Sequence, residues 1–372
     1  MRILLLSCNT GGGHNSAAAA IRSHCEMRGI ECDTRDALLF VSKLHSNVIS
    51  KGHVFVYRYF PRLFGLGYRF EEKHPPRFLY NQMALGAKRF AAFLQENAYD
   101  AIVSTHLFGN MLVTEARKKY GVTVPHYAVI TDYTVYPGAD MVDAKRFFIA
   151  AEQLRSEYVE AGIANDRLVA SGIPVTPGFI DAMDQKTARS NLGLPEGGKL
   201  VLLFSGSIGC GQLNRKAPEL EKQLPESTRL VIICGNNAGV YKQLCSSCGD
   251  QTTVVGFTDR VAEYMAAADL CVAKPGGLST TEMWAIGLPM VLMLSVPGCE
   301  THNMKHFEDQ GVAIGTDNWD EAIRMTAQLV RDDARVAEMR ERLKNITYPG
   351  GATVILDTVA ADLAEQESQK ND

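Results

Sequence analysis

The sequence changes abruptly from apolar to glycine-rich over residues 269–282, which read DLCVAKPGGLSTTE. The run 270–273 is typical of a buried strand, and the residues from Gly277 onward predict a helix. Small residues at a strand-to-helix turn let backbone N–H groups and the positive end of the helix approach an anion closely. Glu282, one turn further on, suits a ribose because the sugar hydroxyls can donate to its carboxylate. This stretch therefore indicates a nucleotide diphosphate site in an α/β fold.

Short apolar runs alternate with longer amphipathic segments on both sides of this stretch, which predicts parallel sheets with crossover helices. A further strand is expected just before Asp36, and a glycine-rich turn follows the first expected strand of each half. The other expected strands cover residues 3–7, 101–104, 126–130, 146–149, 200–204, 230–234, 253–255, 270–273 and 290–294. The repeated pattern predicts an α/β protein of two Rossmann-like domains that face one another across a cleft.

The length also favours two domains, because 372 residues exceed what one core usually supports. Residues 172–177 read GIPVTP, an extended and proline-punctuated stretch that is typical of a linker. We therefore expect an N-terminal domain over 1–173 and a C-terminal domain over 174–352. A C-terminal helix over 353–372 is expected to be able to pack back on the first domain.

The net charge of −4 does not favour nucleic acid or membrane binding by the molecule as a whole. The segment 43–94 differs, because it holds nine Lys or Arg residues against Glu71 and Glu72, together with eleven aromatic residues. Aromatic rings mixed with cations suit an anionic membrane surface. A helical hairpin that packs on its own domain, with its charges solvated, is the alternative interpretation.

The cysteines and the N-terminal sequence indicate the cellular compartment of the protein. Nine cysteines are present, and Cys245 and Cys248 form a C-x-x-C without a second pair at zinc-finger spacing, so structural thiols are expected and no metal site. The N-terminal apolar run is too short for a signal peptide, and no run approaches the roughly 20 apolar residues of a membrane span. The protein is expected in the cytoplasm, and at most peripheral to a membrane.

His14 follows three glycines at an expected strand-to-helix turn, where α/β folds keep their sites. Its imidazole can be neutral at pH 7 and accept a proton. Asp132 follows the expected strand 126–130 and can orient such a base, whereas Ser104 and His106 follow the preceding strand. A helix-terminal histidine that only bonds backbone, and loop capping by the other three residues, remain open alternatives.

A rival class is a dehydrogenase. Residues 11–16 read GGGHNS, a near miss of the G-x-G-x-x-G dinucleotide motif, and Asp36 lies at roughly the distance of its ribose-binding acid. A dehydrogenase, however, does not explain the second glycine turn at 205–211 or the polar residues between 274 and 303.

Taken together, these motifs resemble inverting glycosyltransferases of the GT-B fold, in the family of monogalactosyldiacylglycerol synthases and processive diacylglycerol glucosyltransferases. The resemblance covers nearly the whole chain and rests on SCNTGGGH at 7–14, STH at 104–106, TDY at 131–133, KPGGL at 274–278 and PG at 297–298. It implies an enzyme that transfers a hexose from a UDP-sugar to a lipid acceptor, diacylglycerol, and forms a β-glycolipid without a cofactor or metal.

The resemblance also implies roles for individual residues. His14 would be the general base, supported by Asp132, and the acceptor would contact Ser104, His106 and Tyr133. The segment 43–94 would meet the anionic inner face of the cell membrane. The residues expected to bind the UDP-hexose are Gly13, Gly206, Ser207, Gly209, Gly256, Phe257, Lys274, Gly276, Gly277, Leu278, Glu282, Glu300 and Asn303.

Two positions depart from the family pattern. Cys299 stands where the family usually has a glutamine, and a thiol is only a weak donor to a sugar hydroxyl. Tyr136 and Pro137 follow the 131–133 motif, where the family usually has a histidine and then a tryptophan. The hexose and the acceptor therefore stay open, as do two other functions: a UDP-sugar 2-epimerase and a non-catalytic, membrane-docked sensor of UDP-sugars.

Overall fold

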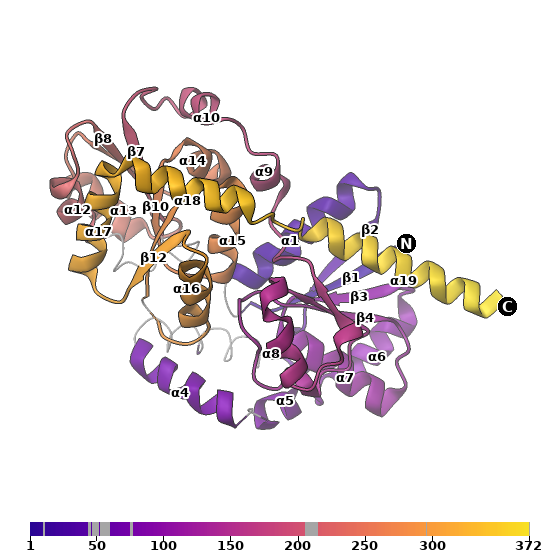
Figure 1. Cartoon of the computed structure of the whole chain (residues 1–372). Helices are drawn as coiled ribbons and strands as arrows, with labels where there is room; N and C mark the ends of the chain where they lie inside the picture. The colour runs from indigo at the N-terminus through magenta and orange to yellow at the C-terminus, as the bar shows by residue number, and fades with distance from the viewer. Residues whose placement is uncertain are drawn as a thin grey trace. The chain divides into compact units, whose positions relative to one another are not determined.

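The chain folds into two compact units, Met1–Thr176 with Pro349–Asp372, and Pro177–Tyr348 (Figure 1). The computed structural model describes residues 1–9, 12–43, 46, 52, 60–74, 77–204, 215–294 and 296–371. The first change of unit falls three residues after the expected boundary at 173, and the return to unit 1 falls four residues before the expected end at 352.

Unit 1 is built on a six-stranded sheet in the order β2-β1-β3-β4-β5-β6. Every pairing is parallel, so all the strands end at the same edge. The strands are β1 (Arg2–Ser7), β2 (Glu31–Asp36), β3 (Ala101–Ser104), β4 (His126–Val129), β5 (Arg146–Ile149) and β6 (Leu168–Ala170). Apart from a polar residue at one or both ends, β1, β3 and β4 are apolar, because both faces of the sheet are covered.

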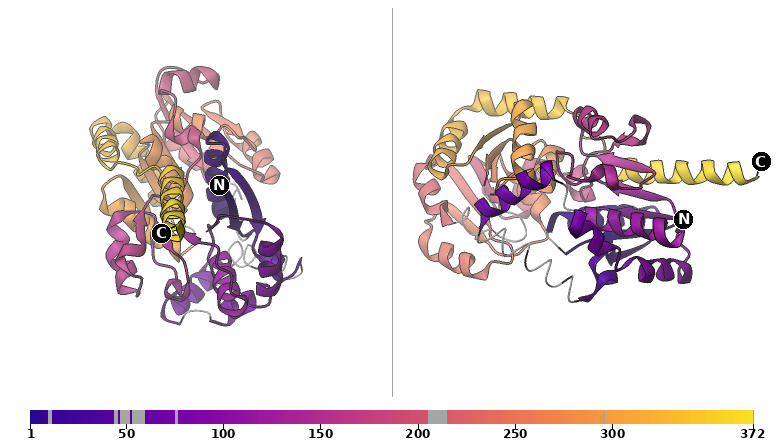
Figure 2. Two further views of the ribbon diagram at one scale, coloured as in Figure 1. Left: turned by 90° about the vertical axis from the view of Figure 1, so that its right-hand side faces the viewer. Right: turned by 90° about the horizontal axis from the view of Figure 1, so that it is seen from below.

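One face of this sheet is covered by α1 (Gly12–Met27) and by α19 (Ala352–Asn371), which returns from the end of the chain. Ile3 and Leu5 of β1 share a core with Ile355 of α19. The last turns of α19 extend past the rest of unit 1 (Figures 1 and 2). The other helices of this unit are α2 (Leu38–Val41), α4 (Pro61–Lys73), α5 (Arg77–Met83), α6 (Ala87–Glu96), α7 (Leu107–Tyr120) and α8 (Arg155–Glu160).

Unit 2 repeats the plan with a parallel six-stranded sheet in the order β12-β11-β10-β7-β8-β9. Its strands are β7 (Lys199–Phe204), β8 (Thr228–Ile233), β9 (Thr252–Val255), β10 (Leu270–Ala273), β11 (Met290–Met293) and β12 (Ala313–Thr316). Its helices are α9 (Pro177–Ile180), α10 (Gln185–Asn191), α12 (Ala217–Gln223), α13 (Ala238–Ser247), α14 (Val261–Ala267), α15 (Gly277–Ile286), α16 (Cys299–Asp309), α17 (Trp319–Arg331) and α18 (Asp333–Asn345).

These sheets confirm the predicted α/β class and the repeated pattern of strands. Two strands were not predicted, β6 and β12, and both lie at sheet edges. β6 has three residues, and the run Leu168-Val169-Ala170 is too brief to carry a periodic signal of its own. β12 is as long as the predicted β10, but Gly315 and Thr316 break its apolar run.

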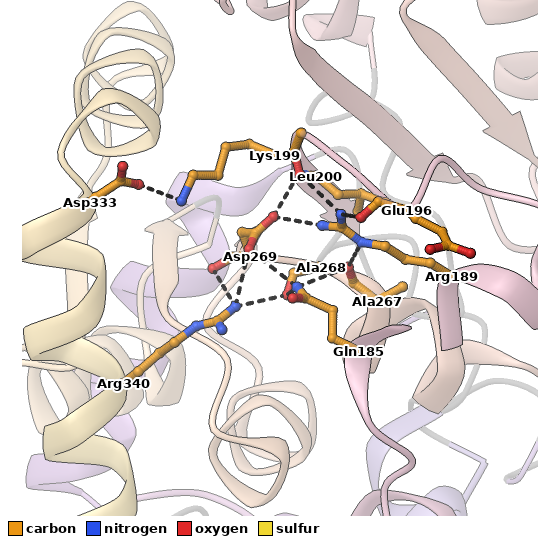
Figure 3. A network of polar contacts seen from close by, with 11 residues as sticks. Gln185, Arg189, Glu196, Lys199, Leu200, Ala267, Ala268, Asp269, Asp333 and Arg340 are labelled. Atoms are coloured by element: carbon orange, nitrogen blue, oxygen red, sulfur yellow. Dashed lines mark hydrogen bonds and ion pairs between the residues drawn. The ribbon is translucent and has the colours of Figure 1, made fainter. Parts of the chain in front are cut away.

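Asp269 joins four elements at the start of the strands of unit 2 (Figure 3). It precedes β10, and its Oδ2 accepts hydrogen bonds from the backbone N–H of Leu200 and from the Arg189 guanidinium, both at 2.8 Å. Its Oδ1 accepts a bond of 3.2 Å from Gln185 and lies 3.5 Å from the Arg340 guanidinium. One carboxylate therefore fastens β7 and β10 to α10 and α18.

Within the part of the chain that the structure describes, no helix has both the length and the apolar character needed to cross a bilayer.

Candidate functional site

His14, which was predicted to act on the acceptor, meets two threonines at the carboxyl edge of the sheet of unit 1. His14 lies in the first turn of α1, which follows β1, whereas Thr105 follows β3 and Thr131 follows β4. Because β1, β3 and β4 are neighbours and parallel, their carboxyl ends bring these three residues together.

The His14 imidazole is held by two contacts at one ring nitrogen. Its Nδ1 lies 2.9 Å from the backbone oxygen of Thr105 and 2.9 Å from the hydroxyl oxygen of Thr131. A carbonyl oxygen can only accept a hydrogen bond, so Nδ1 carries the proton when the ring is neutral. The other ring nitrogen, Nε2, then has the lone pair with which a base takes up a proton.

The surroundings of His14 favour its neutral form. Burial of the half-buried ring lowers the pKa of His14 below its usual value, and this outweighs the opposing influence of the Asp132 charge and of the Thr105 carbonyl. The His106 ring meets His14 edge-on, with 4.4 Å between ring centroids. Burial therefore favours a neutral His14 ring with an unprotonated Nε2.

Asp132 reaches His14 through two intervening hydroxyl groups. The Tyr136 hydroxyl donates to Asp132 Oδ2 at 2.5 Å and lies 3.0 Å from the Thr131 hydroxyl, which in turn contacts His14. Thr131 and Tyr136 were not among the predicted site residues. The departure from the family pattern at position 136 was the one signal in the sequence that pointed to this tyrosine.

The residues expected to contact the acceptor have structural partners. Ser104 is fully buried and donates to the backbone oxygen of His106 at 3.0 Å. His106 caps α7, since its Nδ1 accepts a hydrogen bond from the Phe108 N–H at 3.0 Å. Tyr133 is 2% exposed. Contact of these three residues with an acceptor stays a prediction.

In unit 2, the turn after β10 leads directly into α15. Gly276 is the N-cap of this helix, and no side chain caps it, so the first N–H groups of α15 are not satisfied by a capping side chain. The amide of Asn303, a fully buried residue of α16, donates to the backbone oxygen of Pro275 at 3.0 Å. A hydrogen bond from α16 thus holds the turn that is predicted to bind a diphosphate.

Lys274 and Glu300 form an ion pair beside this turn. Lys274 Nζ lies 2.9 Å from Glu300 Oε1, and the two side chains are 18% and 11% exposed. Glu300 is in the first turn of α16, which starts at Cys299. Lys274, Gly276, Glu300 and Asn303, four of the predicted donor residues, are therefore brought together around one turn.

Glu282 lies on α15, and burial raises its pKa to about 8. Its carboxyl group is therefore largely protonated at pH 7 in the unliganded protein.

Gly256 and Phe257 follow β9 at the same edge of the sheet as the turn after β10. The Phe257 side chain is 69% exposed. Tyr241 of α13 is 38% exposed, and its ring would lie 3.8 Å from a Cβ atom placed on Gly256. Tyr241 was not predicted, because it lies on a separate helix and no sequence motif contains it.

The structure gives fewer contacts for the remaining predicted site residues. Gly13 lies in the first turn of α1 and is exposed, and a Cβ atom there would meet nothing within 4 Å. Gly277 and Leu278 open α15. The predictions for Gly206, Ser207 and Gly209 fall outside the described residues. Among the described residues, no group of three His, Cys, Asp or Glu side chains is arranged to hold a metal ion.

The basic and aromatic segment 43–94 divides into buried and exposed parts. Tyr68, Tyr80 and Phe90 are at most 9% exposed, as the packed-hairpin interpretation expects. On α4, however, Leu63, Leu66 and Phe70 are 59%, 65% and 64% exposed. We call these three residues, which lie three and four positions apart on one face of the helix, the α4 stripe.

Comparison with known proteins agrees with this geometry. Residues 14–175 match the family described as Monogalactosyldiacylglycerol (MGDG) synthase, and residues 200–346 match the Glycosyltransferase family 28 C-terminal domain. The chain is a glycosyltransferase of the GT-B fold. The predicted resemblance is thereby confirmed.

Individual relatives of this glycosyltransferase extend over nearly its full length. It is 26% identical to the processive diacylglycerol beta-glucosyltransferase of Bacillus subtilis strain 168, over 96% of this chain and 94% of the relative. The solved structure of Acinetobacter baumannii MurG superposes with a TM-score of 0.64 at 15% identity, over 96% of this chain and 99% of that one. The calicheamicin glycosyltransferase CalG4 superposes with a TM-score of 0.64 at 14% identity, over 98% and 99% of the two chains. The two structures show the shared GT-B fold.

Proposed function

We propose that this glycosyltransferase transfers a hexose from a UDP-sugar to the hydroxyl group of diacylglycerol, with inversion at the anomeric carbon. Its curated relatives include diacylglycerol glucosyltransferases. The observation that carries the mechanism is the state of His14, whose Nδ1 is tied to a backbone carbonyl while burial lowers its pKa. A neutral ring with its lone pair on Nε2 is what a general base needs.

The reaction is a single displacement. His14 Nε2 takes the proton of the acceptor hydroxyl as that oxygen forms a bond to the anomeric carbon, and the bond from this carbon to the diphosphate oxygen breaks. The electron pair of the broken bond leaves with UDP, and the imidazolium later returns its proton to solvent. N–H groups at the start of α15 stabilise the charge that grows on the diphosphate.

Unit 2 binds the donor in this proposal. The backbone N–H groups around Gly276, Gly277 and Leu278 bind the diphosphate, and the Glu282 carboxylate accepts hydrogen bonds from the ribose hydroxyls. Glu300 and Asn303 meet the hexose, and the pairing of Glu300 with Lys274 fixes the direction in which its carboxylate points. This route uses backbone amides and a helix terminus, and it requires neither a metal nor a cofactor.

UDP release is the experiment that tests the proposed function. UDP-glucose, UDP-galactose and UDP-GlcNAc are each supplied with and without vesicles that contain diacylglycerol. We expect one donor to release UDP in a manner that depends on diacylglycerol. UDP release without lipid, or formation of an epimerised UDP-sugar, would reject lipid glycosylation. UDP binding without any turnover would point to the sensor.

Glu282 predicts a pH dependence of UDP binding. Ribose hydroxyls donate to the ionised carboxylate, whereas the unliganded group has a pKa of about 8, so the affinity for UDP should rise from pH 6 to pH 8 and then level off. The gain should approach about tenfold per pH unit if only the ionised form binds. Calorimetry on Glu282→Gln is the control, because it separates this effect from the titration of the phosphate. If the affinity for UDP changed with pH in the same way in both proteins, Glu282 would not be part of the ribose site.

The α4 stripe supports peripheral attachment to an anionic membrane at the cytoplasmic face. Its side chains are exposed on a segment with a net charge of +7, which suits anionic headgroups. Leu66→Glu should reduce co-sedimentation with vesicles of anionic phospholipid by about tenfold or more, since a buried leucine contributes about 1.5–3 kcal/mol. Met27→Glu on α1 is the matched control, because Met27 is 63% exposed and the charge change is the same. Equal binding by both variants would exclude the α4 stripe.

A further inference from the structure

We propose that Tyr136 is a positioning residue for the reaction, and that its hydroxyl and that of Thr131 form a relay through which Asp132 orients His14. The relay runs from His14 Nδ1 to Thr131 Oγ1 at 2.9 Å, then to Tyr136 at 3.0 Å and to Asp132 Oδ2 at 2.5 Å. This inference rests on the proposed role of His14 as the general base.

The end of the relay determines the direction of every hydrogen bond in it. An ionised carboxylate can only accept, so the Tyr136 hydroxyl donates to Asp132. The oxygen of Tyr136 can then accept from the Thr131 hydroxyl, and the oxygen of Thr131 can accept from the N–H of His14. The relay therefore places the proton on Nδ1, the same nitrogen that the Thr105 carbonyl selects.

The relay also matters when His14 becomes charged. The imidazolium forms in a half-buried place, where burial disfavours the charged ring and the Asp132 charge favours it. The His106 ring contacts His14 from the start of α7, and the pKa of Tyr158 on α8 is raised by burial and then by the nearby Asp132 charge. Asp132 is the group among these that carries a negative charge, and Tyr136 links it to the base.

The loop that carries Tyr136 is held on both sides of that residue. The Tyr158 hydroxyl donates to the backbone oxygen of Thr134 at 2.9 Å, and the Tyr80 hydroxyl donates to that of Pro137. Gly138 follows with a φ of 84°, and a Cβ atom there would approach the Tyr80 ring to 2.6 Å. The glycine allows the close approach of α5 to this loop, so the backbone on both sides of Tyr136 is held in place.

Tyr136→Phe tests the relay, because it removes the hydroxyl and keeps the ring. We expect kcat to fall roughly tenfold to a hundredfold, less than for loss of the base itself, while KM for the UDP-sugar is unchanged. Without the link to Asp132 the imidazolium is less stable, so the acid limb of the kcat profile, measured at saturating UDP-sugar, should move to lower pH. A profile identical to that of the unmodified enzyme would overturn the inference.

Two comparisons separate positioning from packing. Tyr127→Phe removes the hydroxyl of a fully buried tyrosine on β4 that packs on Phe148, away from the relay, and should leave the pH profile in place. Thr131→Val should reproduce the effect of Tyr136→Phe, whereas Thr131→Ser, which keeps a hydroxyl, should restore most of the rate. Failure of Thr131→Ser to exceed Thr131→Val would show that shape, and not the hydroxyl, matters there.

A measurement without turnover distinguishes failure of the relay from failure of the proposed function. Nitrogen-15 NMR reports which ring nitrogen of His14 carries the proton, and His14→Asn assigns the signal. We expect the Nδ1–H form in the unmodified protein, and a lower midpoint of titration in Tyr136→Phe. If this midpoint does not move while His14→Ala abolishes activity, the relay is wrong and the general base stands. If His14→Ala is fully active, the proposed mechanism is wrong whatever the NMR result.

Discussion

Replacement of His14 by alanine should lower kcat by about 10²–10⁴, the usual contribution of a general base. His14 is the ring whose Nδ1 is tied to Thr105, and no other side chain is proposed to take the acceptor proton. UDP should bind His14→Ala with unchanged affinity, because the proposed donor residues Gly276, Glu282 and Glu300 all belong to unit 2. Steady-state kinetics together with calorimetry of UDP binding measure both quantities.

The pH profile of the unmodified enzyme provides a second check on His14. The base acts in its neutral form, and burial lowers its pKa, so kcat measured at saturating UDP-sugar should persist below pH 6.5 and fall only at more acidic pH. A variant His14→Ala that turns over at nearly the normal rate would remove His14 from the mechanism. An acid limb of kcat above pH 7 would contradict the lowered pKa of His14.

Replacement of Asp269 by alanine should lower the free energy of unfolding of unit 2 by about 3–5 kcal/mol, the usual cost of removing one partner from a buried ion pair. The Arg189 side chain is 5% exposed and would lose its anionic partner, and the Leu200 N–H would lose its acceptor (Figure 3). Both tryptophans, Trp284 and Trp319, lie in unit 2. Their fluorescence during denaturant unfolding therefore reports on this unit directly.

The control for Asp269 lies in the same part of unit 2. Lys199 pairs with Asp333, but these side chains are 36% and 77% exposed (Figure 3). An exposed ion pair contributes about 1 kcal/mol or less, so Lys199→Ala should change the unfolding midpoint only slightly. If Asp269→Ala were no more destabilising than Lys199→Ala, the proposed fastening of β7 and β10 would be wrong.

The local pattern of the sequence was sufficient for most of the fold. Buried parallel strands are near-continuous apolar runs, so strands such as 200–204 and 270–273 stand out against their flanking turns. The glycine-rich turn before His14 likewise placed this histidine at the start of a helix, where the structure has it. β6 escaped prediction because three residues carry little hydrophobic signal, and β12 because Gly315 and Thr316 break its apolar run.

The side-chain contacts of the site could not be predicted in the same way, because they join residues that are distant in sequence. His14 meets Thr105 and Thr131 only once β1, β3 and β4 are paired. The ion pair of Lys274 with Glu300 depends in the same way on the packing of α16 beside the turn after β10. Asp132 was predicted to support the base, and this stays a prediction. The two hydroxyls that lie between Asp132 and His14 depend on how the 131–138 loop folds.

The anomeric configuration of the glycolipid product is the most direct test of a single displacement assisted by His14. The product made from a UDP-α-hexose and diacylglycerol is analysed by proton NMR, with UDP-glucose or UDP-galactose as the donor. One inversion predicts a β-glycoside, with the large H1–H2 coupling of two axial protons. An α-linked product, with a small coupling, would mean net retention and would rule out a direct attack by an acceptor hydroxyl that His14 deprotonates.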